Sequence, residues 1–311
     1  MHSSARRRFA SASIPLRCAA ALACALLVAC GGGTAREGGR TRVVASTPLL
    51  AELAASVAGD DATVSALIPA AVDLHSYEPP PQAARLVAQA DLLLVNGYRL
   101  EESLLDVIVQ NRRSGTPIVA ASEGIDPIAG SPARGKAAIG AAGDPHFWLD
   151  VANAVSYVER IRDALVQVDV AHAAGYRARA AGTVEALRAL DAELRSQLAA
   201  IPPHRRKLVL FHDAFQYFAR AYGFELVAAV LPASAAQQPS AADVARIVEL
   251  VRRTGVPAVF QEPQFSGQVL ELVARETGVR VLMLTDTYTD SAPSYAEMMP
   301  ANARALVEGL R

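Results

Sequence analysis

The segment between Asp169 and Ala200 contains no proline, and its only glycines are Gly175 and Gly182. Ile201-Pro202-Pro203 follows it and ends a helix, because proline lacks a backbone N–H donor. A helix of about 30 residues extends roughly 45 Å, which is long for a globular protein. Its leucines recur at i, i+3, i+7 and i+11, on one helical face: Leu187, Leu190, Leu194 and Leu198.

A helix of this length either projects as a coiled-coil arm or links two parts of the chain. The apolar repeat is too short to favour a coiled coil, which needs several heptads. We therefore expect residues 169–203 to form a linking helix that crosses from an N-terminal α/β lobe (31–168) to a C-terminal α/β lobe (204–311).

Short β-branched runs alternate with amphipathic stretches on both sides of this segment, as in α/β proteins with parallel sheets. Four strands in each half predict two lobes with mainly parallel four-stranded sheets, bridged by one long helix. The expected strands cover 42–45, 63–67, 91–95, 118–120, 207–211, 225–230, 258–261 and 280–284. The expected helices cover about 47–58, 81–89, 101–112, 151–167, 213–222, 241–254, 265–277 and 292–310, and residues 126–144 read as a surface loop.

Residues 1–30 have the composition of a secretory signal peptide rather than of a folded domain. Arginines precede an apolar stretch, 18–29, that is too short for a permanent membrane helix. Leu27-Val28-Ala29-Cys30 resembles a bacterial lipobox, which predicts lipidation of Cys30 and a lipid-anchored protein on the periplasmic or cell-surface face of the membrane. Cleavage by ordinary signal peptidase without lipid is the alternative. Gly31–Gly33 would serve as a flexible tether.

The three cysteines all lie in this leader, at positions 18, 24 and 30, so the mature chain forms no disulfide and depends on its core. About 280 residues remain, which is enough for one large domain or two lobes. The formal net charge is −1, and no basic stripe with interleaved aromatic residues is present. We therefore exclude nucleic acid as the partner.

Three histidines and one aspartate each follow an apolar run or a proline, where a strand gives way to a loop: His75, His146, His212 and Asp286. Three neutral imidazoles and a carboxylate complete a tetrahedral shell for a divalent metal such as zinc. Their separation, roughly 70 residues each time, favours a cleft between lobes over a local zinc knuckle. A purely structural role is the alternative for each residue. His75 would be a loop histidine, His212 would cap a helix and Asp286 would cap a turn. His146 would be a ring buried beside Phe147 and Trp148.

Together, the segments around these residues resemble the metal-specific solute-binding lipoproteins of bacterial zinc and manganese ABC importers. The resemblance covers nearly the whole mature chain, in the family's order and with its spacing. The segments that carry it are Ala45-Ser-Thr-Pro-Leu-Leu, Asp73-Leu-His75-Ser-Tyr-Glu-Pro, Asp144-Pro-His146-Phe-Trp-Leu-Asp150, Phe211-His212-Asp-Ala-Phe, Thr285-Asp286-Thr and Ser294-Tyr-Ala-Glu-Met-Met.

The resemblance implies a monomer whose two lobes, joined by one long helix, close only slightly around a metal cargo. It also implies a cognate ABC permease and ATPase as partners. Zinc-type members have histidine at the position of His212, where manganese-type members often have glutamate, so Zn²⁺ is the expected cargo and Mn²⁺ or Fe²⁺ the alternatives. Two departures are Val151, where proline is frequent, and the absence of histidine from 126–143, which leaves open a broader metal range.

Two other function classes are a secreted zinc hydrolase and a surface adhesin. A hydrolase keeps one metal position open for water, whereas four protein ligands close the shell. The chain also has no His-Glu-x-x-His motif, and we expect no enzyme. No motif points to adhesion. Glu262, after a predicted strand, is a candidate to fix the tautomer of a ligand histidine, and metal binding should weaken below about pH 6.5 as such histidines protonate.

Overall fold

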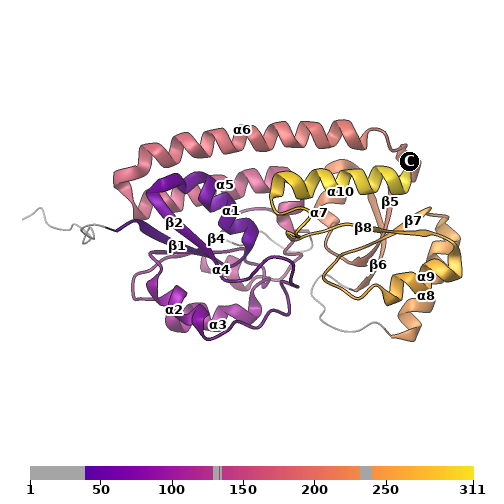
Figure 1. Cartoon of the computed structure of the whole chain (residues 1–311), viewed down its shortest axis with the longest axis horizontal. Helices are drawn as coiled ribbons and strands as arrows, with labels where there is room; N and C mark the ends of the chain where they lie inside the picture. Colours follow the sequence, from indigo (N-terminus) through magenta and orange to yellow (C-terminus); the bar gives the residue numbers. More distant parts are fainter. Residues whose placement is uncertain (1–38, 129–132, 134, 232–239) are drawn as a thin grey trace, which may run out of the picture. The chain divides into compact units, whose positions relative to one another are not determined.

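Each half of the chain forms a four-stranded sheet in which all neighbouring strands are parallel (Figure 1). The computed structural model describes residues 39–128, 133, 135–231 and 240–311. The first sheet has the order β2-β1-β3-β4 and the second the order β6-β5-β7-β8. The strands are β1 (Thr41–Ala45), β2 (Ala62–Ala66), β3 (Leu92–Val95), β4 (Ile118–Ala120), β5 (Lys207–His212), β6 (Glu225–Leu231), β7 (Ala258–Gln261) and β8 (Arg280–Met283).

Strands β3 and β7 lie inside their sheets and are mostly apolar, because helices cover both faces of a parallel sheet. All four residues of β3 are buried, as are all four of β7. The helices are α1 (Pro48–Ala58), α2 (Gln82–Gln89), α3 (Glu102–Asn111), α4 (Lys136–Gly140), α5 (Val151–Val168), α6 (Ala173–Leu198), α7 (Gln216–Tyr222), α8 (Ala241–Thr254), α9 (Gln268–Thr277) and α10 (Tyr295–Leu310).

Local sequence signals set several helix ends. Thr47 caps α1, where its side chain accepts a hydrogen bond from the backbone of Leu50. Ser240 and Asp243 form a capping box at the start of α8. Gly223, with φ of 72°, ends α7 in the left-handed conformation that glycine adopts without steric cost.

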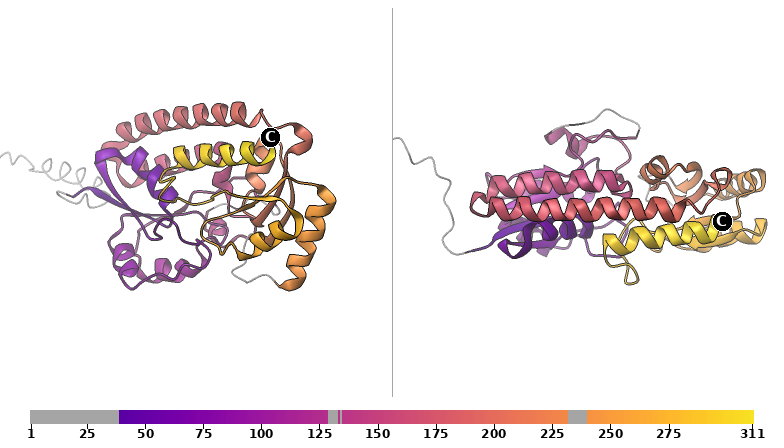
Figure 2. Two further views of the ribbon diagram at one scale, coloured as in Figure 1. Left: turned by 45° about the vertical axis from the view of Figure 1, so that its right-hand side comes forward. Right: turned by 90° about the horizontal axis from the view of Figure 1, so that it is seen from above.

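Helix α6 is the predicted link between the two halves. It packs against α1 and α5 of the first half and against α10 of the second (Figures 1 and 2). At 26 residues it extends about 39 Å at 1.5 Å per residue. The leucine stripe is buried on its inner face. The α/β fold with two lobes bridged by one long helix is therefore confirmed; the exact lobe limits remain a prediction.

The linking helix begins later than predicted, because Asp169 interrupts the chain. Asp169 ends α5, adopts φ −141° and ψ 74°, and precedes a short 3-10 turn, Val170–His172. Its carboxylate accepts hydrogen bonds from Thr41 Oγ1 (3.0 Å), His172 Nδ1 (2.8 Å) and Tyr176 OH (2.7 Å). These side-chain bonds stabilise a turn there, so α5 and α6 form a helical hairpin.

Some other helices start later than predicted, because a non-helical segment takes the place of their expected first turn. Helices α7, α9 and α10 each begin three residues later than predicted, at Gln216, Gln268 and Tyr295. The predicted surface loop 126–144 contains the short helix α4, and part of this segment is buried. Ala138 in α4 is fully buried, and its carbonyl accepts a hydrogen bond from Tyr98 N (2.8 Å).

The main apolar core is shared by both halves. One continuous cluster includes residues of the first sheet, of α6, of α7 and of α10, while a second cluster lies among β5, β6, β7, α8 and α9. Separating the two sheets would expose part of this shared core to water, which is unfavourable. This continuity supports small rather than large relative motion of the lobes.

Among the described residues, no helix is long and apolar enough to cross a membrane. The predicted signal peptide and Cys30 lie outside the described residues.

Replacing Leu194 of α6 by alanine should lower the free energy of unfolding by about 2–5 kcal/mol, because its side chain is fully buried. Urea unfolding followed by circular dichroism measures the change. Ser196→Ala, on the exposed side of the same helix, is the matched control and should change the midpoint little. Equal midpoints for the two variants would show that the leucine stripe does not hold the helix in place.

Candidate metal centre

The loop after β2 places His75 from the first half of the chain. The backbone N–H of His75 donates to Asp73 Oδ1 (3.0 Å), and Ser76 Oγ donates to Asp73 Oδ2 (2.5 Å). Asp73 thus folds the loop into a turn that fixes the backbone of His75. The His75 side chain is partly buried.

His146 lies immediately before a short 3-10 turn, Phe147–Leu149, and is fully buried. Asp144 Oδ1 accepts from its backbone N–H (2.9 Å) and lies 2.8 Å from its Nδ1. A neutral ring that donates its Nδ1 proton to Asp144 keeps its lone pair on Nε2. The Pro145 carbonyl is itself held by Asn96 Nδ2 (2.9 Å).

The second half of the chain supplies His212 and Asp286 from the carboxyl ends of parallel strands. His212 is the last residue of β5 and is fully buried. Asp286 follows β8 by three residues and is 4% exposed. Ligands of open α/β sheets commonly bind at this edge of the sheet.

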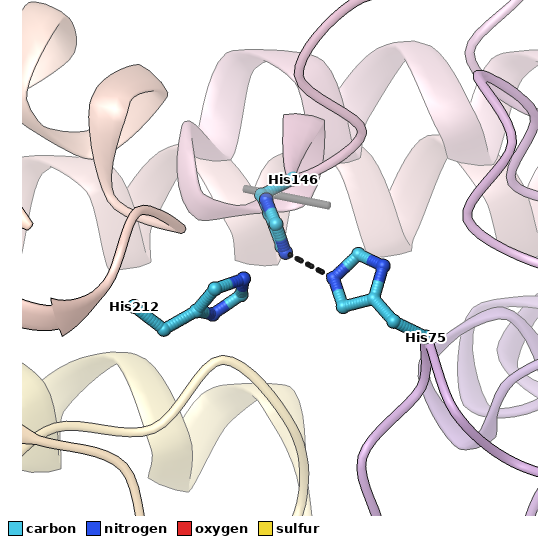
Figure 3. Close-up of side chains that lie close together, drawn as sticks. All are labelled: His75, His146 and His212. Carbon is cyan, nitrogen blue, oxygen red and sulfur yellow. Dashed lines mark hydrogen bonds between the residues drawn. The ribbon is translucent and has the colours of Figure 1, made fainter. Parts of the chain in front are cut away.

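The four predicted residues come together. The ring centroids of His75, His146 and His212 lie 5.0–5.3 Å apart, and each ring turns a nitrogen toward the others (Figure 3). One potential ligand atom from each histidine lies within 4.8 Å of the other two. Asp286 Oδ2 lies 3.8 Å from His146 Nε2 and 3.9 Å from His212 Nδ1.

The spacing matches the edge of a coordination tetrahedron. His75 Nε2 and His146 Nε2 are 3.2 Å apart. Two nitrogens bound to one zinc at about 2.0–2.1 Å are separated by about 3.4 Å in tetrahedral geometry. The donors, three imidazoles and a carboxylate, suit zinc and neighbouring first-row metals.

Burial keeps two of these histidines neutral. It lowers the pKa of His75 to about 3, with further lowering from the nearby His146 and His212 rings. Burial, together with His212, also lowers the pKa of His146 to about 3. Only the neutral imidazole offers a lone pair to a metal, so the fold keeps these rings in the binding form.

Two residues that orient the site were not singled out from the sequence. Asp144 holds His146, and Gln264 Nε2 donates to Asp286 Oδ1 at 2.8 Å. The signal for Asp144 is a repeated Asp-x-His spacing, since Asp73 precedes His75 in the same way and accepts the same backbone hydrogen bond. Nothing in the local sequence distinguishes Gln264.

Glu262 lies beside His212, as the sequence suggested, but is not hydrogen-bonded to its ring. Its Oε1 is 3.8 Å from His212 Nδ1, beyond hydrogen-bond distance. Glu262 is 1% exposed, and burial raises the pKa of its carboxyl well above the usual value, with Asp286 adding to the effect. Its role in fixing the tautomer of His212 remains a prediction.

Trp148 forms a wall of the centre. Its ring centroid lies 5.4 Å from that of His146, and its Nε1 donates to the Asp286 carbonyl at 2.8 Å. His172 and His204 are exposed and lie outside the cluster. Because Trp148 belongs to the first half of the chain and Asp286 to the second, their hydrogen bond joins the two halves at the centre.

Known proteins that are similar in sequence to this chain are named for the metals that they bind. The chain is 32% identical over 276 residues to the manganese-binding lipoprotein MntA of Halalkalibacterium halodurans, covering 86% of this chain and 88% of the relative. It is 32% identical over 280 residues to the iron-binding protein YfeA of Yersinia pestis, covering 86% of each.

Solved structures show the same fold. The periplasmic zinc-binding protein TroA from Treponema pallidum superposes with a TM-score of 0.78 at 27% identity, covering 88% of this chain and 99% of that one. The family described as zinc-uptake complex component A, periplasmic (ZnuA), matches residues 43–309. This chain therefore belongs to the ZnuA family.

Proposed function

We propose that this protein captures Zn²⁺ between its two lobes outside the cytoplasm and delivers it to the permease of an ABC importer, which a cognate ATPase drives. The observation that carries the proposal is the meeting of His75, His146, His212 and Asp286 from four separate segments of the chain. The family consists of substrate-binding proteins of importers, not of enzymes.

The metal is cargo rather than a resident cofactor. Four protein donors leave a tetrahedral ion no open position for a reacting water. Loops from both halves surround the ion, so the lobes must separate locally for it to leave. Docking on the permease would supply the contacts that favour this separation.

Mn²⁺ or Fe²⁺ is the second candidate cargo, because the relatives at 32% identity are named for manganese and iron. Three imidazoles favour zinc, and the Irving–Williams order places zinc above both alternatives for such a site. Because this order favours zinc at nearly any such site, a higher affinity for zinc does not identify the metal that the protein carries in the cell. Elemental analysis of protein purified from its native envelope does: a zinc content near one per chain supports Zn²⁺, and manganese or iron in its place supports the alternative.

Lipid anchoring at Cys30 is part of the proposal, supported by the lipobox and by relatives that are named lipoproteins. Cys30→Ala removes the thiol that carries the lipid. We expect the wild-type protein to sediment with membranes and the variant to appear in the soluble extracytoplasmic fraction, as seen by immunoblotting. An identical membrane distribution of the two proteins would contradict the anchor.

Single substitutions of His75, His146 or His212 by alanine should each weaken Zn²⁺ binding by at least a hundredfold. Loss of an outer partner alone typically costs about 10–100-fold, and loss of a direct ligand should cost more. Isothermal titration calorimetry with a competing chelator measures the change. His204→Ala, at an exposed turn, is the control and should bind like the wild type. A histidine whose removal leaves the dissociation constant unchanged is not a ligand.

Binding should survive mild acid better than the sequence alone suggests. Two histidines of ordinary pKa would lose about a hundredfold in affinity between pH 7.5 and 5.5, because protons would occupy both ligand nitrogens. The pKa values of His75 and His146 are about 3. Protons therefore compete with the metal for these two rings only at lower pH. We expect the Zn²⁺ affinity at pH 5.5 to stay within about tenfold of that at pH 7.5. A loss of a hundredfold or more would contradict neutral rings in the free protein.

A further inference from the structure

Helix α1 of the first half contacts the segment between β8 and α10 of the second half, which also contains Asp286. The half-buried Glu52 on α1 accepts two hydrogen bonds through Oε2, one from Tyr288 OH and one from the backbone N–H of Tyr295 (3.0 Å). Both tyrosines are almost fully buried. Figure 1 shows the first turn of α10 beside α1.

A second bond joins the same segment to the loop of His75. The Tyr288 carbonyl accepts from the backbone N–H of Ala71 at 2.8 Å. Ala71 has φ of 61°, a left-handed conformation that is unfavourable for alanine and persists only where surrounding contacts hold it. Ala71 lies four residues before His75, and Tyr288 lies two residues after Asp286. Tyr288 therefore connects two ligand loops that belong to different halves.

Two further bonds include the loop of His146. Tyr295 OH donates to the Trp148 carbonyl (2.6 Å), and Trp148 Nε1 donates to the Asp286 carbonyl (2.8 Å). Tyr295 is thus bonded to Glu52 through its backbone and to Trp148 through its hydroxyl. If the loops of His75 and His146 are to separate from Asp286, bonds of this network must break.

We propose that Glu52 and Tyr288 form an interlobe clasp whose opening limits the rate at which bound metal leaves the centre. Neither side chain is a metal ligand in the proposed shell. Both are positioning residues that hold the Asp286 segment against the first half. The clasp rests on the proposed metal-binding function and adds to it the step that controls release.

The dissociation rate of Zn²⁺ tests the clasp. Zinc-loaded protein is mixed with an excess of a chromogenic chelator in a stopped-flow instrument, and release is followed by absorbance. Glu52→Ala and Tyr288→Phe should each accelerate release by about tenfold or more, since hydrogen bonds to a charged group are among the stronger ones. Glu52→Gln keeps an acceptor oxygen without the charge and should give an intermediate rate.

The double variant Glu52→Ala/Tyr288→Phe should release zinc no more than about twofold faster than the faster single variant, because both changes break one shared contact. Glu297→Gln is the matched control: this exposed glutamate accepts from Ser294 Oγ in the first turn of α10, and its loss should not change the rate. The absorption spectrum of the Co²⁺-loaded variants should match that of the wild type, which shows an intact ligand shell.

Release rates of Glu52→Ala and Tyr288→Phe within twofold of the wild type would overturn the clasp. Multiplying effects in the double variant, or an altered Co²⁺ spectrum in Tyr288→Phe, would also overturn it, since the residues would then act separately or through the ligand shell. A wild-type protein that takes up no Zn²⁺, Mn²⁺ or Fe²⁺ would instead contradict the proposed function itself. Tyr288→Phe removes a single hydroxyl, and thermal unfolding of the metal-free protein verifies that it folds.

Discussion

The His75 and His146 rings lie close to each other and to His212, and burial keeps these two rings neutral, which is the constraint that shapes the centre. A second charge so close to the first would be repelled without water to screen it. The lowered pKa values of His75 and His146 express this cost. The same burial disfavours protonation and leaves the lone pairs of the imidazole nitrogens directed into a shared space. This space suits a divalent cation, which binds to those lone pairs. Asp286 adds a carboxylate beside the rings, which partly offsets the charge of the ion.

The surrounding fold explains how such a centre keeps its geometry and still releases its contents. The linking helix α6 and the shared apolar core oppose large rotation of one half against the other. The candidate ligands, in contrast, lie on loops or strand ends, where local movement costs less than separating the sheets. Hydrogen bonds from Tyr288 and Tyr295 to Glu52 join these loops across the two halves. The affinity for the metal and its residence time thus have partly separate structural origins. The affinity depends on the donor atoms, and the residence time depends on the contacts that hold the loops together.

Much of this arrangement is predictable from sequence, because it depends on local periodicity and on short motifs. Within the described residues, each of the eight expected strands is present to within one residue of its predicted bounds, and the long leucine stripe predicts α6. The turn at Asp169 is not predictable in this way, since its carboxylate bonds to Thr41, which is 128 residues distant. The contact between Glu52 and Tyr288 spans 236 residues and is invisible to any local pattern. The four candidate ligand residues can be picked out from the sequence because each has its own motif, whereas Gln264, which bonds to one of them, has none.

The fold alone does not determine which metal the centre binds. Related chains with this fold are named for manganese, iron and zinc, so the two-lobed scaffold does not itself distinguish among these ions. The donor set does so only in part: three imidazoles favour zinc over manganese at equilibrium, but the Irving–Williams order gives that preference to nearly any such site. A contact such as the Glu52–Tyr288 clasp touches no metal and should slow release of every ion to a similar extent. Selectivity must therefore come from the donor atoms and from the metal supply outside the cell membrane, while the clasp governs how long any captured ion stays bound.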